Sequence, residues 1–332
     1  MIEVAMHDGH PLQVEAEGDG PAILLPVNPW PLEGPKAEEM RKWGTDPALG
    51  RTLIDGLRDR YRVIAFDYEG HALSKPKPDT LTPDHVAADF LAIADAASAG
   101  RFAYYGYSWL ALAGMQLALR TDRLSALIMG GYPPVGGPYR EMLQVTKATH
   151  AMSGEGGVQW EPGSETVDGK EGDSDAKDTA KNIEKDVADT SLSSADGMAN
   201  VDWSSAEGRS GSAADAASWE DFDWSAVEVA MNRDQTRQFV TLYEALQNFD
   251  DHAAQSRLSM PRLCFAGTHD IIAYGDAFGG VTVDIAGAFA RNRGALEAFG
   301  WEVRALEGLD HTQAMQAAKV LPLIRPWLDA IL

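Results

Sequence analysis

Cysteine and long hydrophobic segments are what this sequence has least of. The 332 residues include a single cysteine, Cys264, which excludes an intrachain disulfide and a cysteine-rich zinc module. No run approaches the ~20 apolar residues of a membrane span. The first residues, MIEVAMHDGH, lack the basic and then apolar pattern of a signal peptide. The sequence therefore predicts a soluble, cytoplasmic protein with no membrane partner.

Basic side chains are also scarce. The chain has 28 Lys and Arg against 50 Asp and Glu, which gives a formal net charge of -22. Because such a protein repels phosphate groups, we expect no nucleic acid partner. The excess of acidic residues is concentrated in residues 155–228, which hold 19 acidic and five basic side chains.

The stretch 155–228 is unusual in composition as well as in charge. It is rich in Ser, Gly, Ala and Asp and poor in Leu, Ile and Val. Chains of this kind bury too little apolar area to offset the entropy lost on ordering. Aromatic residues still punctuate it, namely Trp160, Trp203, Trp219, Phe222 and Trp224. Two interpretations stay open: a loosely structured, solvated insertion, or a lid over a pocket.

Outside this stretch, short apolar runs alternate with longer amphipathic ones. The predicted strands are 12–17, 22–27, 62–66, 102–105, 124–129, 262–266 and 302–306. The predicted helices are 49–60, 82–97, 109–120, 236–249, 285–299 and 313–331. Strands joined by helices form parallel sheets, which bind ligands at the carboxyl ends of their strands. The predicted fold class is therefore α/β, a mainly parallel central sheet flanked by helices, with a long, partly irregular lid insertion.

Ser108 occupies the most distinctive position in the sequence. It stands in YYGYSWLALAG, where a predicted strand turns directly into a helix, a place that exposes a serine hydroxyl. The motif resembles the G-x-S-x-G nucleophile elbow of the α/β-hydrolase superfamily, with Leu110 in place of the second glycine. The resemblance implies an α/β-hydrolase core from residues 1–132 and 251–332. The resemblance does not cover residues 133–250, which we expect to form a lid or cap insertion with its acidic low-complexity stretch.

A second motif, FDYEGHALS, supports the same resemblance. It is similar to the superfamily's D-x-R-G-x-G-x-S, with Glu69 in place of the arginine and Ala72 in place of a glycine. We expect a turn from Asp67 to Ser74 that shapes a loop at the edge of the pocket. No catalytic part is assigned to Asp67.

A serine hydroxyl is a weak nucleophile, so it needs a base and a group that orients the base. Of the eight histidines, His311 is the one that follows the last predicted strand, where the superfamily keeps its catalytic histidine. The superfamily's order of Ser, then Asp or Glu, then His implies Asp270 as the acid, because it follows the predicted strand 262–266. Asp310, next to His311, is the competing candidate.

Acyl transfer also requires donors for the oxyanion of the tetrahedral intermediate. The backbone N–H of Trp109 is the first. The segment LLPVNPW occupies the place of the family's His-Gly motif, and because Pro29 has no N–H, Asn28 is the second candidate. Trp30 and Tyr107 are expected to bind the substrate in an apolar pocket.

These residues predict a serine hydrolase that cleaves a small or medium ester, lactone or related acyl compound through an acyl-enzyme. The implied partner is a small-molecule substrate, with no metal and no cofactor, and the oligomeric state stays open. Four alternatives remain: a C–C bond hydrolase, an aminopeptidase-type relative, a non-catalytic ligand-binding or receptor-like member of the fold, and a scaffold whose acidic insertion binds a basic partner. Dehalogenases and epoxide hydrolases of this architecture use an aspartate nucleophile, so Ser108 argues against both.

Overall fold

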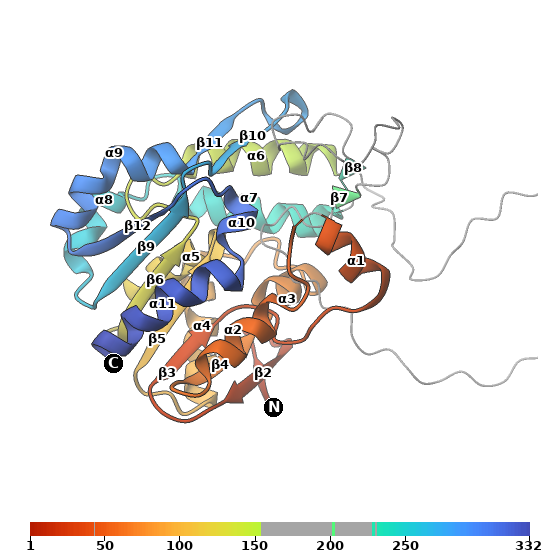
Figure 1. Cartoon of the computed structure of the whole chain (residues 1–332). Helices are drawn as coiled ribbons and strands as arrows, with labels where there is room; N and C mark the ends of the chain where they lie inside the picture. The colour runs from red at the N-terminus through yellow and green to blue at the C-terminus, as the bar shows by residue number, and fades with distance from the viewer. Residues whose placement is uncertain (43, 154–200, 203–227, 230) are drawn as a thin grey trace, which may run out of the picture.

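A twisted sheet runs through the centre of the molecule (Figure 1). The computed structural model describes residues 1–42, 44–153, 201–202, 228–229 and 231–332. Most of the acidic stretch 155–228 lies outside these residues. The two interpretations of that stretch, a solvated insertion or a lid, therefore concern residues outside the described ranges. The strands of the main sheet are β1 (Ile2–Ala5), β2 (Pro11–Glu17), β3 (Ala22–Leu25), β4 (Arg62–Phe66), β5 (Phe102–Tyr107), β6 (Leu124–Gly130), β9 (Arg262–Gly267) and β12 (Trp301–Leu306).

The strand order brings the chemistry-bearing turns to one edge of the sheet. The order is β1-β2-β4-β3-β5-β6-β9-β12. From β4 to β12 every neighbouring pair is parallel, whereas β2 runs antiparallel to β4 and β1 antiparallel to β2. The carboxyl ends of the six parallel strands therefore meet at the same edge. The predicted α/β class with a mainly parallel central sheet is confirmed.

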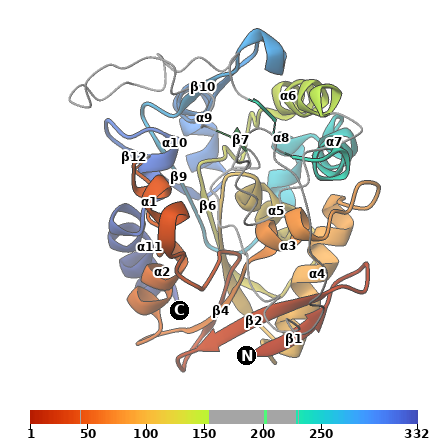
Figure 2. The ribbon, with the colours of Figure 1, turned by 90° about the vertical axis from the view of Figure 1, so that its right-hand side faces the viewer.

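Helices cover both faces of the sheet (Figure 2). They are α1 (Gly34–Lys42), α2 (Leu49–Leu57), α3 (Tyr68–Ser74), α4 (Pro83–Ala96), α5 (Trp109–Ala118), α6 (Tyr139–Met152), α7 (Arg233–Leu246), α8 (Asp251–Ala254), α9 (Ile285–Ala298), α10 (His311–Ala314) and α11 (Ala317–Ile331). Helices α2 and α11 bury apolar side chains on one face, and α4, α5 and α9 do so on the other. Successive strand residues serve opposite cores, as Leu24 does relative to Ile23 and Leu25.

Several elements near the carboxyl ends of the strands differ from the sequence-based expectations. The expected turn from Asp67 to Ser74 is largely the helix α3, which the Asp67 side chain caps by accepting from the backbone N–H of Gly70 at 2.8 Å. The helix α6 lies in the region expected to be irregular. The predicted helix 313–331 is two helices, because Gln316 takes an extended conformation between them. The strands β10 (Ile271–Ala273) and β11 (Thr282–Asp284) form an antiparallel hairpin that was not expected.

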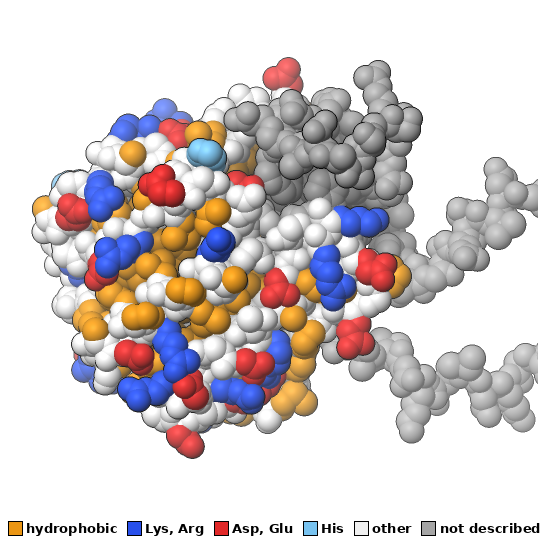
Figure 3. All heavy atoms as spheres, in the orientation of Figure 1, with side chains coloured by type: hydrophobic (Ala, Val, Ile, Leu, Met, Phe, Trp, Pro, Cys, Tyr) orange, Lys and Arg blue, Asp and Glu red, His pale blue; other side chains and the backbone are white. Residues whose placement is uncertain are grey.

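Two helices form a separate layer at the carboxyl-end edge of the sheet. Helices α6 and α7 pack along each other, and α6 lies beside the β10–β11 hairpin (Figure 1). The short strands β7 (Val201–Asp202) and β8 (Glu228–Val229) pair with each other. None of the helices among the described residues is long and apolar enough to cross a membrane. On the face seen in Figure 3, acidic and basic side chains are interspersed among exposed hydrophobic ones.

Candidate active site

Ser108 stands at a sharp turn between β5 and α5. Its backbone has φ 54° and ψ -132°, a conformation that non-glycine residues rarely adopt. The turn is held by its backbone N–H, which donates to the Gly130 carbonyl at 2.9 Å, and by its carbonyl, which accepts from the Ala111 N–H at 2.9 Å. A strained residue held in this way is typical of a functional site. The chain thus forms the elbow that the motif predicts.

The elbow tolerates Leu110 because the close approach falls elsewhere. At Gly106 a Cβ atom would lie 2.4 Å from the Leu110 carbonyl oxygen, so the first glycine of the motif is required. The Leu110 side chain instead faces a cavity that also contains Asn28. Its carbonyl accepts a hydrogen bond from the Tyr104 hydroxyl at 2.7 Å.

The imidazole of His311 pairs with the carboxylate of Asp270. Nδ1 of His311 lies 3.0 Å and 2.9 Å from the two carboxylate oxygens, and Asp270 is fully buried. Since a carboxylate accepts, Nδ1 carries the proton of this contact, and Nε2 is then the basic nitrogen of the neutral ring. The competing Asp310 faces elsewhere, because its side chain caps α10 by accepting from the Gln313 N–H at 2.7 Å.

Ser108 and His311 line one apolar pocket, which encloses about 750 Å³ of empty space, part of it open to solvent. Both residues are almost buried, with 9% and 6% of their surfaces exposed. Gly131, at the end of β6, has φ 62° and lies so close that a Cβ there would be 2.9 Å from Cε1 of His311. Seven residues of the helical layer line this pocket: Met142, Val145, Thr146 and Thr149 of α6, and Thr236, Phe239 and Tyr243 of α7.

The β10–β11 hairpin supplies another wall of the same pocket. It begins directly after Asp270, and Ile272, Tyr274 and Val283 line the cavity. The Asp270 carbonyl accepts from the backbone N–H of Ala286 at 2.9 Å, which closes the base of the hairpin. Near its tip, the side chain of Gln144 in α6 donates to the Gly279 carbonyl at 2.7 Å. The hairpin thereby joins the acid-bearing loop to α6.

A second cavity lies on the other side of the elbow. It is lined by the predicted oxyanion residues Asn28 and Trp109, by Tyr107 and by the carboxyl-bearing Glu69, and Trp109 lines both cavities. The indole N–H of Trp109 donates to Glu69 at 3.0 Å, which fixes the ring between them. The Asn28 side chain is turned to the backbone N–H of Trp30, from which it accepts at 2.9 Å.

The structure places the two expected substrate-binding aromatics away from the first pocket. The Tyr107 hydroxyl donates to the His311 carbonyl at 2.7 Å, and its ring lies 5.0 Å from the imidazole, so Tyr107 backs the histidine. Trp30 lines neither of the two cavities described above. Sequence reasoning missed the walls from α6 and the hairpin. The 3–4 spacing of Met142, Val145 and Thr149 is the signal that could have revealed α6.

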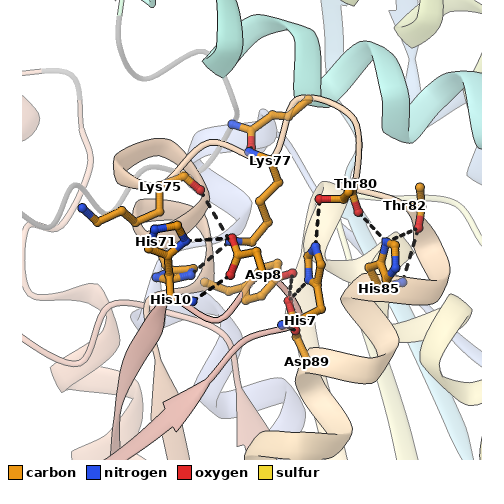
Figure 4. A network of polar contacts seen from close by, with 12 residues as sticks. His7, Asp8, His10, His71, Lys75, Lys77, Thr80, Thr82, His85 and Asp89 are labelled. Atoms are coloured by element: carbon orange, nitrogen blue, oxygen red, sulfur yellow. Dashed lines mark hydrogen bonds and ion pairs between the residues drawn. The ribbon is translucent and has the colours of Figure 1, made fainter.

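The face of α7 that points away from the pocket is fastened to the core. Its Gln235, Gln238 and Thr241 side chains make hydrogen bonds of 2.8, 3.1 and 2.5 Å with the backbone of residues 73–78. This segment leads into a network of charged and polar groups between the β1–β2 turn and α4 (Figure 4). The pocket wall therefore depends on the position of residues 73–78.

Lys77 is the centre of that network. Its side chain is fully buried, its ammonium group forms an ion pair with Asp8, and it lies 3.2 Å from Nε2 of His71 (Figure 4). Burial, and then the charge on Lys77, lower the pKa of His71 from its usual 6.5 to about 4. His71 is therefore neutral near pH 7, and its Nε2 accepts from the ammonium group.

A metal centre is not evident in the part of the chain that the structure describes, where no three His, Cys, Asp or Glu side chains group suitably for an ion. The polar groups that meet in the pocket are instead a hydroxyl, an imidazole and the carboxylate behind it. This set can perform nucleophilic and acid–base chemistry on its own.

Comparison with known proteins bears on the architecture. A family model described as alpha/beta hydrolase fold matches residues 44–160, which include Ser108 and its elbow. An esterase from Thermogutta terrifontis with malate bound superimposes with a TM-score of 0.52 over 99% of this chain and 98% of that one, at 15% identity. The chain has the α/β-hydrolase fold. The fold that the two motifs led us to expect is confirmed.

Other solved structures with the α/β-hydrolase fold match equally broadly. An enol-lactonase from Burkholderia xenovorans LB400 is 18% identical, with a TM-score of 0.51 over 98% of this chain and 99% of that one. An epoxide hydrolase from Vigna radiata is 16% identical, with a TM-score of 0.52 over 99% and 97%. No curated protein sequence matches significantly. At these identities the likeness concerns the α/β-hydrolase fold and leaves the reaction to the site itself.

Proposed function

We propose that the protein is a serine hydrolase that cleaves a small or medium ester, lactone or related acyl substrate through an acyl-enzyme. One observation carries the proposal: the imidazole of His311, paired with buried Asp270, lines the same apolar pocket as Ser108 at its strained elbow. An esterase and an enol-lactonase with the same fold are compatible with it.

In the first half-reaction Ser108 is the nucleophile. Its Oγ attacks the acyl carbon, while Nε2 of His311 takes the hydroxyl proton. Asp270 keeps the other ring nitrogen protonated and stabilises the imidazolium that forms. The C–O bond to the leaving group then breaks, and His311 gives the proton to the departing oxygen. The product of this stage is an acyl ester of Ser108.

In the second half-reaction water replaces the serine. His311 takes a proton from the water, the resulting hydroxide attacks the acyl carbon, and Ser108 leaves with the proton returned by His311. In both halves negative charge develops on the former carbonyl oxygen. The backbone N–H groups of Trp109 and Asn28 are proposed to stabilise this oxyanion. Their positions after β5 and β3, on adjacent strands, support the assignment.

Labelling by a fluorophosphonate probe tests the nucleophile directly. We expect the wild-type protein to be labelled at Ser108, with labelling abolished in Ser108→Ala and strongly reduced in His311→Ala. Ser153→Ala is the matched control, since Ser153 is buried near the pocket but its hydroxyl donates to the His150 carbonyl at 2.7 Å. Hydrolysis of chromogenic esters of graded acyl length should follow the same pattern. A protein that binds esters but is neither labelled nor active would be the non-catalytic member of the fold.

A further inference from the structure

The residues that the structure describes give the first pocket no charged wall. The described residues that line it include no Lys, Arg, Asp or Glu, and outside the Ser108–His311 pair its surface is made mainly of apolar and aromatic side chains. A charged group that entered would lose its hydration without gaining a counter-charge. The net charge of -22 further disfavours an anion. The part of the substrate that fills this pocket is therefore uncharged.

Three threonines interrupt the apolar wall: Thr146 and Thr149 on α6 and Thr236 on α7. Thr236 is already occupied. Its hydroxyl lies 3.0 Å from the Arg233 carbonyl, 2.9 Å from Nδ1 of His150 and 2.9 Å from the Ser153 hydroxyl. Its one hydrogen is directed to a backbone carbonyl and two side chains lie close to the same oxygen, so this hydroxyl is engaged within the protein. Thr236 joins the ends of the two helices and is not the group that a substrate would meet.

The two threonines of α6 are different. The Thr149 hydroxyl donates to the Val145 carbonyl at 2.9 Å, and the Thr146 hydroxyl donates to the Leu143 carbonyl at 3.2 Å. Each hydrogen is thus committed to the helix backbone, and what each oxygen presents to the pocket is an acceptor. Both side chains are buried, and their spacing of three residues puts them on the same face of α6. The hydroxyl oxygens that α6 contributes to this wall are therefore hydrogen-bond acceptors.

From this pattern we propose that Thr146 and Thr149 select the substrate. On the basis of the function proposed above, the substrate is an uncharged ester or lactone whose apolar part carries a hydrogen-bond donor, a hydroxyl or an N–H, that reaches these two oxygens. A substrate without the donor displaces water from both threonine oxygens and forms no hydrogen bond with them to replace it. A site that contains buried polar groups discriminates against such an analogue for this reason.

Matched pairs of nitrophenyl esters test the proposal. Each pair has the same acyl chain with and without one hydroxyl, placed at successive carbon atoms, and the readout is the ratio of the two kcat/KM values. For the best position we expect wild-type protein to prefer the hydroxylated ester by about fivefold, the size of one neutral hydrogen bond. Thr149→Val and Thr146→Val keep the shape and remove the oxygen, so each should lower the ratio toward one. Thr52→Val is the control, because that hydroxyl likewise donates to the carbonyl four residues earlier, that of Ala48 at the start of α2, and Thr52 lines neither cavity.

Two outcomes would overturn the selection by threonine. One is a wild-type ratio of one or less at every hydroxyl position, and the other is a preference that both valine variants retain. Failure of the proposed function gives a different result, namely no hydrolysis of any ester and no labelling of Ser108. In that event, dissociation constants of the same ester pairs for Ser108→Ala, measured by calorimetry, still compare the two ligands. Equal constants for both members of every pair would refute the selection without reference to turnover.

Discussion

The neutral imidazole of His71 makes a specific prediction about stability and pH. The pKa of His71 is about 4 in the folded protein against 6.5 for an ordinary histidine. Between these two values the unfolded chain binds a proton that the folded protein does not. Stability is therefore complete above pH 6.5 and falls as the pH is lowered toward 4. At ~1.4 kcal/mol per pKa unit, the loss attributable to this one group reaches about 3 kcal/mol.

The surroundings of His71 support the size of this effect. Burial is the main cause of the lowered pKa, followed by the charge on Lys77, while Asp8 acts in the opposite direction. His71 is only 7% exposed, so solvent screens these charges weakly. A protonated imidazole would also lose its role as acceptor for the Lys77 ammonium group. Protonation of His71 would thus place a charge in a buried site and break its hydrogen bond with Lys77.

The control is His71→Gln, which does not titrate but retains a side-chain oxygen that can accept from Lys77. Free energies of unfolding from urea titrations of both proteins at several values between pH 7 and pH 4 give the comparison. We expect the wild-type protein to lose about 3 kcal/mol more than the variant over this range. Parallel curves for the two proteins, or an NMR titration that gives His71 an ordinary pKa, would refute the reasoning.

Three further predictions concern the site. In ester assays, Asp270→Asn should lower kcat by about 10³- to 10⁴-fold, whereas Asp310→Ala should retain turnover. In thermal melts, Asp310→Ala should lose only ~1 kcal/mol of stability, because it removes a helix cap. Gly131→Ala should reduce turnover at least tenfold or so, because its Cβ would displace His311, and a variant as active as the wild type would contradict this geometry. Glu69→Leu should lower the free energy of unfolding by about 1–3 kcal/mol in urea titrations, since it leaves the buried Trp109 indole N–H without its acceptor; Glu69→Gln, which keeps an oxygen there, should lose less.

The sheet was readable from the sequence because its central strands, β3, β4, β5, β6 and β9, are short and buried on both faces and helices separate most of them along the chain. The elbow was equally accessible, because the G-x-S pattern stands directly between a predicted strand and a predicted helix. The sequence also indicated that Asp270 and His311 lie at the same edge of the sheet. Each follows a parallel strand, β9 or β12, and parallel strands have their carboxyl ends at one edge. Their direct contact at 2.9 Å agrees with the pairing that the chain order implied.

The pocket walls were less accessible because they depend on contacts between distant segments. The helix α6 ends just before the acidic stretch. Its region was therefore expected to be irregular, and its apolar periodicity was not used. The hairpin after Asp270 consists of three-residue strands, too short to give a clear alternating pattern. Tyr107 was expected to face the substrate, yet its neighbour Gly131 leaves room for it to pack against His311. The direction in which such a side chain points depends on tertiary packing, which the local sequence does not reveal.

The hairpin between β10 and β11 makes the acid and a wall of the pocket one continuous piece of chain. A change of length within residues 271–284 would alter the room available to a ligand and, through the same backbone, the aim of the Asp270 carboxylate. Helix α6 belongs to a different segment of the chain, so substitutions on it leave the backbone next to Asp270 unchanged. In laboratory evolution toward new ligands, substitutions should therefore accumulate in α6, and insertions in the hairpin should be rare.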